Sequence, residues 1–166
     1  ARHVLDRWIL SRLSETAGIV ETFLDAYEAQ GSARAIASFL EDLSNWYIRR
    51  SRERFQHPEN KADYRLALAT LSYVFEQTLK LVAPFMPFVT DHIWRQSNKG
   101  SVHLELFPSL SAKLIDKPLM YAMIKAREAV SAALQKRAHA GIKVRQPLLT
   151  LKIKDADLEP ALLELI

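Results

Sequence analysis

The sequence contains no cysteine and only four glycines among its 166 residues. Without cysteine, the chain can form neither a disulfide bond nor a thiolate zinc site. The scarcity of glycine disfavours a fold built from many strands and tight turns. No apolar run is long enough to cross a bilayer, and no signal-peptide pattern opens the chain. These absences exclude disulfide scaffolds and membrane-spanning proteins, and they favour a fold built from helices.

Sequence motifs of catalysis are also missing. The chain has no glycine-rich phosphate loop and no dinucleotide fingerprint. Its five histidines are scattered along the sequence, and no two of them stand four residues apart. Paired spacing of that kind is what a helix needs to present two histidines to one metal ion. We therefore expect no catalytic residue, no metal site and no bound cofactor in this chain.

What the chain does contain is ordinary for a globular protein. Apolar residues make up 49% of the sequence and charged residues 25%, and the formal net charge is +4. That charge is a weak bias toward polyanionic partners, so the position of the basic residues matters more than their sum. The chain lacks an initiator methionine and ends within an apolar pattern. We expect it to be a fragment of a longer protein.

Apolar residues recur at three- and four-residue spacing over most of the chain, which is the pattern of amphipathic helices. Gly31 is expected to end the first helix, Ser32 to cap the second and Gly141 to end the last. Short turns between long helices favour antiparallel packing in a bundle. The predicted helices cover residues 4–29, 32–55, 62–83, 88–96 and 119–140.

The C-terminal part of the chain follows a different pattern. Apolar and polar residues alternate over residues 142–146 and 149–154, which predicts two short strands separated by Pro147. Residues 101–106 alternate in the same way and predict a short extended segment. An acidic helix is expected to begin at Asp155.

The predicted elements give a mainly α fold. We expect an antiparallel helical bundle over residues 1–108, followed by a small mixed α/β portion over residues 109–166. This second portion would contain a helix and short strands, and it would be incomplete. Residues 108–118, which begin and end with proline, would connect the two.

Residues 42–55 form the most unusual stretch, with the adjacent large aromatic residues Trp46 and Tyr47 and four arginines. On a helical wheel, Trp46 and Tyr47 continue the apolar stripe of the second helix, and Arg50 and Arg54 lie on the same stripe. Guanidinium groups are almost never fully buried unless paired. Either the helix runs past the edge of the core there, or these arginines meet an anion. An arginine-rich helix end with internal ion pairs explains the stretch as well.

The composition of this stretch suits nucleic acid. The planar fork of arginine donates two parallel hydrogen bonds to phosphate, and aromatic side chains stack on unpaired bases. Antiparallel packing of the first two helices would bring Arg7 and Trp8 close to it. A second basic group follows the fifth predicted helix, and a solvated helix end explains it equally well. That group comprises Lys136, Arg137, Lys143 and Arg145.

Several segments resemble the anticodon-binding domain of class Ia aminoacyl-tRNA synthetases. Residues 6–13 (DRWILSRL) resemble its opening, and residues 83–94 (APFMPFVTDHIW) resemble a block three helices later. Residues 43–52 (LSNWYIRRSR) and 141–148 (GIKVRQPL) are most similar to the isoleucyl members of the class. Valyl-, leucyl- and methionyl-tRNA synthetases share the first and third of these four blocks in chain order, and they remain as alternatives.

The resemblance implies a non-catalytic domain that binds the anticodon arm of the tRNA for isoleucine. The parent enzyme, an ATP-dependent isoleucine-tRNA ligase of the cytoplasm, would use ATP with magnesium in its catalytic domain. That catalytic domain and an editing domain would be partners of this fragment. Neither a membrane nor DNA would be bound. A helical protein-interaction scaffold, whose arginines pair with acidic side chains, is the alternative from another class.

The resemblance and the residue pattern together give a set of RNA-binding candidates. Trp8 and Trp46 would stack on bases, Arg7 would read a base edge or clamp a phosphate, and the other arginines would contact phosphates. The full set is Arg7, Trp8, Asn45, Trp46, Arg49, Arg50, Arg52, Arg54, Lys143 and Arg145.

Overall fold

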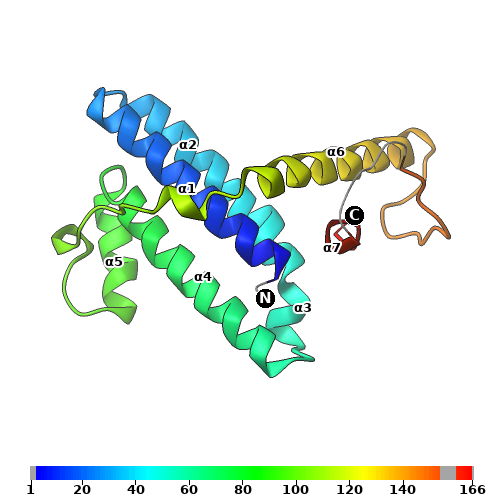
Figure 1. Cartoon of the computed structure of the whole chain (residues 1–166), viewed down its shortest axis with the longest axis horizontal. Coiled ribbons are helices and arrows are strands. Elements are labelled where there is room, and N and C mark those ends of the chain that lie inside the picture. The colour runs from blue at the N-terminus through cyan, green and yellow to red at the C-terminus, as the bar shows by residue number, and fades with distance from the viewer. Residues whose placement is uncertain (1–2, 154–159, 166) are drawn as a thin grey trace. The chain divides into compact units, whose positions relative to one another are not determined.

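The computed structural model describes residues 3–153 and 160–165. The chain divides into two compact units, Ala1–Asp116 and Lys117–Ile166, and each is described by itself. All regular structure in the described residues is helical (Figure 1), which confirms the expected mainly α fold. No helix in that part of the chain is both long and apolar enough to cross a membrane.

The first unit is a bundle arranged around helix α1. This helix contacts α2, α4 and the short turns η1 and η3, and Figure 1 shows α1 and α2 side by side. Because α1 has neighbours on several sides, nearly all of its N-terminal half is buried. The elements of the unit are α1 (Val4–Asp25), α2 (Ala29–Glu41), η1 (Asp42–Ile48), α3 (Arg52–Gln56), α4 (Lys61–Val82), α5 (Pro87–Ser97), η2 (Val102–Leu104) and η3 (Ala112–Leu114).

The turn between α1 and α2 differs from the prediction. α1 ends at Asp25, and Tyr27 takes the left-handed conformation (φ 57°) that glycine usually supplies after a helix. Gly31 and Ser32 lie inside α2. A Cβ atom on Gly31 would stand 2.8 Å from the ring of Phe23. Gly31 therefore allows two helices to approach closely, and it does not end one.

The second predicted helix, over residues 32–55, is interrupted. Its middle is the π-helical segment η1, and α3 begins only after the buried Ser51. Buried residues along this stretch recur every four positions, at Phe39, Leu43, Tyr47 and Ser51. A uniform α-helix would rotate such positions away from the core, because its period is 3.6 residues. The wider π turn keeps them on one side, and π segments are frequent at functional sites.

The segment after α5 is held by one carboxylate. Residues 101–106, predicted to be extended, contain the 3₁₀ turn η2 instead. Asp91 accepts hydrogen bonds from the Ser101 hydroxyl (2.5 Å) and the Val102 amide (3.0 Å), and it pairs with Arg95 (2.7 Å). These local bonds satisfy the turn without a neighbouring strand. The hydrogen bond from Ser101, followed by that from Arg95, lowers the pKa of Asp91 from 3.8 to about 2.

This carboxylate gives a pH-dependent prediction. Because its folded-state pKa lies below its unfolded value, Asp91 stabilises the fold above about pH 4 and loses that effect as the pH falls toward 2. We expect the Asp91→Asn variant to melt at a lower temperature than the parent chain near neutral pH. The difference should shrink toward zero at about pH 2. Thermal melting of both chains across this range measures it, and a constant difference would mean that shape, not charge, matters at this position.

The second unit contains α6 (Lys117–His139) and α7 (Pro160–Leu163). Gly141, with φ at 66°, follows the end of α6, as the sequence predicts. The guanidinium of Arg137 then donates hydrogen bonds to the carbonyl groups of Lys143, Val144 and Gln146. These bonds fold the chain back as a turn.

The two predicted strands do not form over residues 142–146 and 149–153. Leu149 is fully exposed and Val144 is 72% exposed. The alternating apolar residues therefore do not form a buried face in this structure. Residue 154 and the predicted start of the acidic helix at Asp155 lie outside the described residues.

Candidate nucleic-acid interface

A buried polar network lies where α1, η1, α3 and α4 meet. The guanidinium of Arg54 binds both carboxylate oxygens of Asp6 at 2.9 Å and both oxygens of Asp63 at 2.8 Å. Asp6 is fully buried, and the Arg54 side chain is only 12% exposed. Burial alone lowers the pKa of Arg54, but the hydrogen bonds to the two carboxylates outweigh it and raise this pKa. Arg54 is therefore a fixed internal cation.

Tyr47 belongs to the same network. Its hydroxyl donates a hydrogen bond of 2.9 Å to Asp6, and its ring meets that of Phe55 edge to face. Burial, reinforced by the negative charge of Asp6, raises the pKa of Tyr47. The hydrogen bond from Arg54 lowers the pKa of Asp63. Tyr47 thus ties η1 to α1, and Arg54 ties α3 to α1 and α4.

Two sequence-predicted RNA contacts are revised by these positions. The guanidinium of Arg54 donates hydrogen bonds to the carboxylates of Asp6 and Asp63. Trp8 is only 1% exposed. Neither side chain offers a free surface to a ligand in this structure. Of the alternatives that the sequence left open for Arg54, the structure shows internal ion pairs, and their carboxylates belong to Asp6 and Asp63.

Five of the remaining candidates lie within residues 45–52, on η1, just after it and at the start of α3. Trp46 is partly buried, and Arg50 stands over its indole ring, with its guanidinium carbon 5.1 Å from the ring centroid. Arg52 donates a hydrogen bond to the Gln56 side chain. Four of these five candidates are exposed, and the five together are Asn45, Trp46, Arg49, Arg50 and Arg52. We call them the Trp46 surface.

The Trp46 surface is electropositive. Neither Arg49 nor Arg50 has an acidic partner among the residues that the structure describes. Partial burial and the charge of Arg49 both lower the pKa of Arg50. Two adjacent cations without a counter-ion attract a polyanion.

The other basic candidates have varied surroundings. Arg7 is half exposed and pairs with Asp116 at 2.6 Å. Arg12, also on α1, pairs with Asp42 and Glu15. Lys143 and Arg145 are exposed in the second unit. Their contact with RNA stays a prediction.

Sequence reasoning missed Asp6 and Asp63 as the residues that organise this region. The signal was the position of Arg54 on an apolar stripe, which requires a buried counter-ion. Nothing in the local sequence says which carboxylates supply it. They come from α1 and α4, 48 and 9 residues away.

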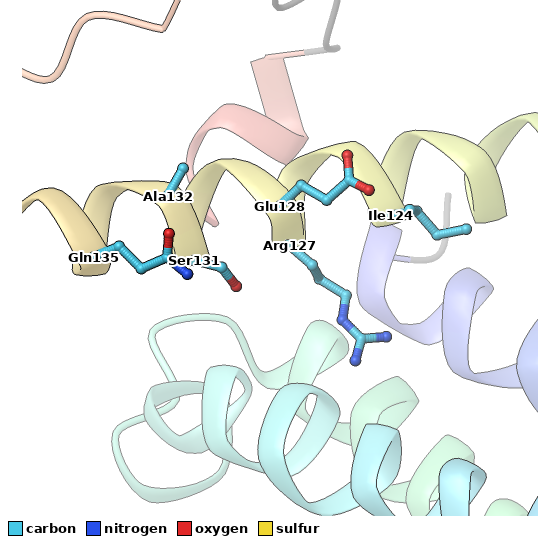
Figure 2. Close-up of a pocket in the computed structure, with 6 residues that line it drawn as sticks. All are labelled: Ile124, Arg127, Glu128, Ser131, Ala132 and Gln135. Carbon is cyan, nitrogen blue, oxygen red and sulfur yellow. The ribbon is translucent and has the colours of Figure 1, made fainter.

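Not every hollow of the surface has such chemistry. One lies along α6 and is lined by Ile124, Arg127, Glu128, Ser131, Ala132 and Gln135 (Figure 2). All six side chains come from one helix, and only two of them carry charge, of opposite sign. The described residues contain no group of three acidic or histidine side chains that could hold a metal ion.

The chain is similar to a known protein family and to individual known proteins. A family described as the anticodon-binding domain of tRNA ligase matches residues 6–153. The chain is 40% identical over 154 residues to an isoleucine–tRNA ligase of Streptomyces coelicolor, and 37% identical over 160 residues to one of Deinococcus radiodurans. These alignments cover 89% and 95% of this chain, but only 14% and 15% of the relatives. The chain thus spans about one seventh of the curated relatives it matches.

Proposed function

Because this chain belongs to the family of anticodon-binding domains of tRNA ligases, we propose that it is the part of an isoleucine–tRNA ligase that holds the anticodon arm. The Trp46 surface is the observation that carries the proposal. It joins an aromatic ring, three arginines and an amide on one exposed stretch. Anticodon loops present unpaired bases beside phosphates, which are the groups that these side chains bind.

We assign different RNA contacts to different residues of the Trp46 surface. Arg49 and Arg52 would contact phosphates, which fix the position of the RNA without reading its sequence. Asn45 would hydrogen-bond a base edge. Arg7, Lys143 and Arg145 would extend the contact to the rest of the arm. Trp8 and Arg54 would act indirectly, as buried supports.

The full ligase would supply the chemistry. It would join isoleucine to its tRNA in the cytoplasm, using ATP with magnesium in a catalytic domain, and an editing domain would remove wrongly attached amino acids. This chain would hold the anticodon arm so that the acceptor end of the tRNA reaches that catalytic domain. Its partners would be the tRNA and those other domains.

Fluorescence anisotropy of a labelled anticodon stem-loop tests the proposal. We expect this chain to bind the isoleucine stem-loop more tightly than one with a scrambled anticodon, and binding should weaken as salt is raised. Equal binding to both loops would reduce the surface to a general basic patch. No binding at low salt by a folded chain would contradict the proposed function of this domain.

A further inference from the structure

Arg50 and Arg54 occupy equivalent positions along one stripe, but their surroundings are opposite. Arg54 has two carboxylates within 2.9 Å, whereas Arg50 has no acidic partner in the described part of the chain. Arg50 lies instead over the Trp46 indole, at 5.1 Å from the centroid. Among the described residues, the Arg50 guanidinium therefore contacts an aromatic ring and no carboxylate.

The contact with Trp46 covers one side of a flat cation. A guanidinium over an indole is held by cation–π attraction and by stacking. Arg50 as a whole is exposed, so a ligand can reach its side chain. Unpaired RNA bases stack on guanidinium planes as well as on aromatic rings. A base arriving at this place would meet Arg50 before it meets Trp46.

A hydrogen bond made by the neighbouring residue helps to hold Trp46 and Arg50 in place. Tyr47, the neighbour of Trp46, is anchored to the buried Asp6, which fixes the π segment against α1. Trp46 and Arg50 are separated by four positions, so they lie on the same side of the helical stretch. Partial burial of Arg50 also lowers its pKa, as expected for a cation that has given up part of its water. A side chain held in this way loses little freedom when a flat ligand stacks on it.

We propose that Arg50, supported by Trp46, is the residue on which one base of the anticodon loop stacks. This inference rests on the proposed function and assigns Arg50 a role different from the phosphate contact that the sequence suggested. The outer plane of the guanidinium takes the base, and its N–H groups stay free for the edge of a neighbouring base or for a phosphate. Phosphate binding is left to Arg49 and Arg52.

The test is a pair of matched substitutions, Arg50→Lys and Arg49→Lys, in the 166-residue chain. Lysine keeps the charge but has no planar group. The probes are the isoleucine anticodon stem-loop and versions in which each loop nucleotide in turn lacks its base. Stem-loop affinity and its salt dependence are measured by anisotropy, and circular dichroism verifies the fold of each variant.

We expect Arg50→Lys to weaken stem-loop binding about tenfold, as for the loss of one base stack, with an unchanged salt slope. Arg49→Lys should weaken it by less than about twofold, because a phosphate contact needs mainly charge. Removing one particular base should weaken the parent chain by the same factor as Arg50→Lys. Removing that base should have no further effect on the Arg50→Lys variant, because both changes delete the same contact.

Three results would overturn this inference. Equal affinities for the two lysine variants would make Arg50 a phosphate contact like its neighbour. Additive losses at every loop position would mean that no base stacks on it. If the parent chain does not bind the stem-loop or ignores its sequence, the proposed function fails, and this inference fails with it. The first two results leave the proposed function intact.

Discussion

Replacing Asp6 with asparagine lowers the free energy of unfolding of the first unit by about 3 kcal/mol or more. Removing one partner of a buried ion pair costs about 3–5 kcal/mol, because the other charge is left uncompensated. In the variant, Arg54 would retain only Asp63, which is one-third exposed. The new amide nitrogen would also face the guanidinium donors. Urea unfolding followed by circular dichroism measures the change.

A matched control separates burial from charge. Arg7→Gln also removes an ion pair that joins distant parts of the chain, but Arg7 is half exposed. Exposed pairs contribute only about 0–1 kcal/mol, so we expect a small effect. Combining Asp6→Asn with Arg54→Met should recover part of the stability, because the stranded cation is then absent. A loss below about 1 kcal/mol for Asp6→Asn would show that the network does not hold the bundle together.

The bundle itself was largely predictable from spacing. The ranges of α1, α4, α5 and α6 follow apolar patterns of period 3.6 and end within a few residues of the predicted limits. The π segment was not predictable in this way. From η1 to the start of α3, the buried residues Leu43, Tyr47 and Ser51 stand four apart. A helical wheel drawn with a period of 3.6 residues treats this spacing as one continuous α-helix. The extra width of the turn is stabilised by tertiary contacts such as that of Tyr47 with Asp6.

The residue types of the candidate site were predictable from the sequence, but the neighbours that each side chain meets were not. The sequence identified four arginines and the aromatic pair Trp46 and Tyr47 within residues 42–55. It placed Arg50 and Arg54 on one stripe, and only the tertiary structure separates them. Asp6 and Asp63 reach Arg54, whereas Trp46 reaches Arg50. Trp8 illustrates the same limit, because an amphipathic pattern does not show that α1 has neighbours on several sides.

The second unit shows where alternation misleads. Residues 142–146 have the period of a strand, but a strand forms only where a partner supplies hydrogen bonds. Here the Arg137 side chain supplies them to three carbonyl groups. The local sequence does not show whether these carbonyl groups will pair with a neighbouring strand or accept hydrogen bonds from a distant side chain.

Replacing Arg49, Arg50 and Arg52 together with glutamine should weaken binding of the anticodon stem-loop about 1,000-fold. A hydrogen bond to a charged group contributes about 1.5–3 kcal/mol, and screening at exposed sites favours the lower end. Each arginine then accounts for about a tenfold change in affinity. All three are exposed and none has an internal ion pair in the described residues, so the fold should persist. Anisotropy at several salt concentrations measures the affinity.

The salt dependence of the same variant identifies the contacts. Each lost phosphate contact in single-stranded RNA lowers the salt slope by about 0.7. If all three arginines bound phosphates, the slope would fall by about 2. If Arg50 stacks on a base and only Arg49 and Arg52 bind phosphates, it should fall by about 1.4. The two readings of Arg50 therefore differ in the slope even where they agree on affinity.

Net charge is the remaining explanation to exclude, and a second triple variant does so. Arg34, Lys99 and Lys113 are exposed on other elements of the first unit, and replacing all three with glutamine removes the same charge. An attraction that depends on net charge alone would weaken equally in both triple variants, because each removes three positive charges. Direct contacts at the Trp46 surface would be lost only in the first. Equal losses would therefore contradict the assignment of the anticodon arm to this surface.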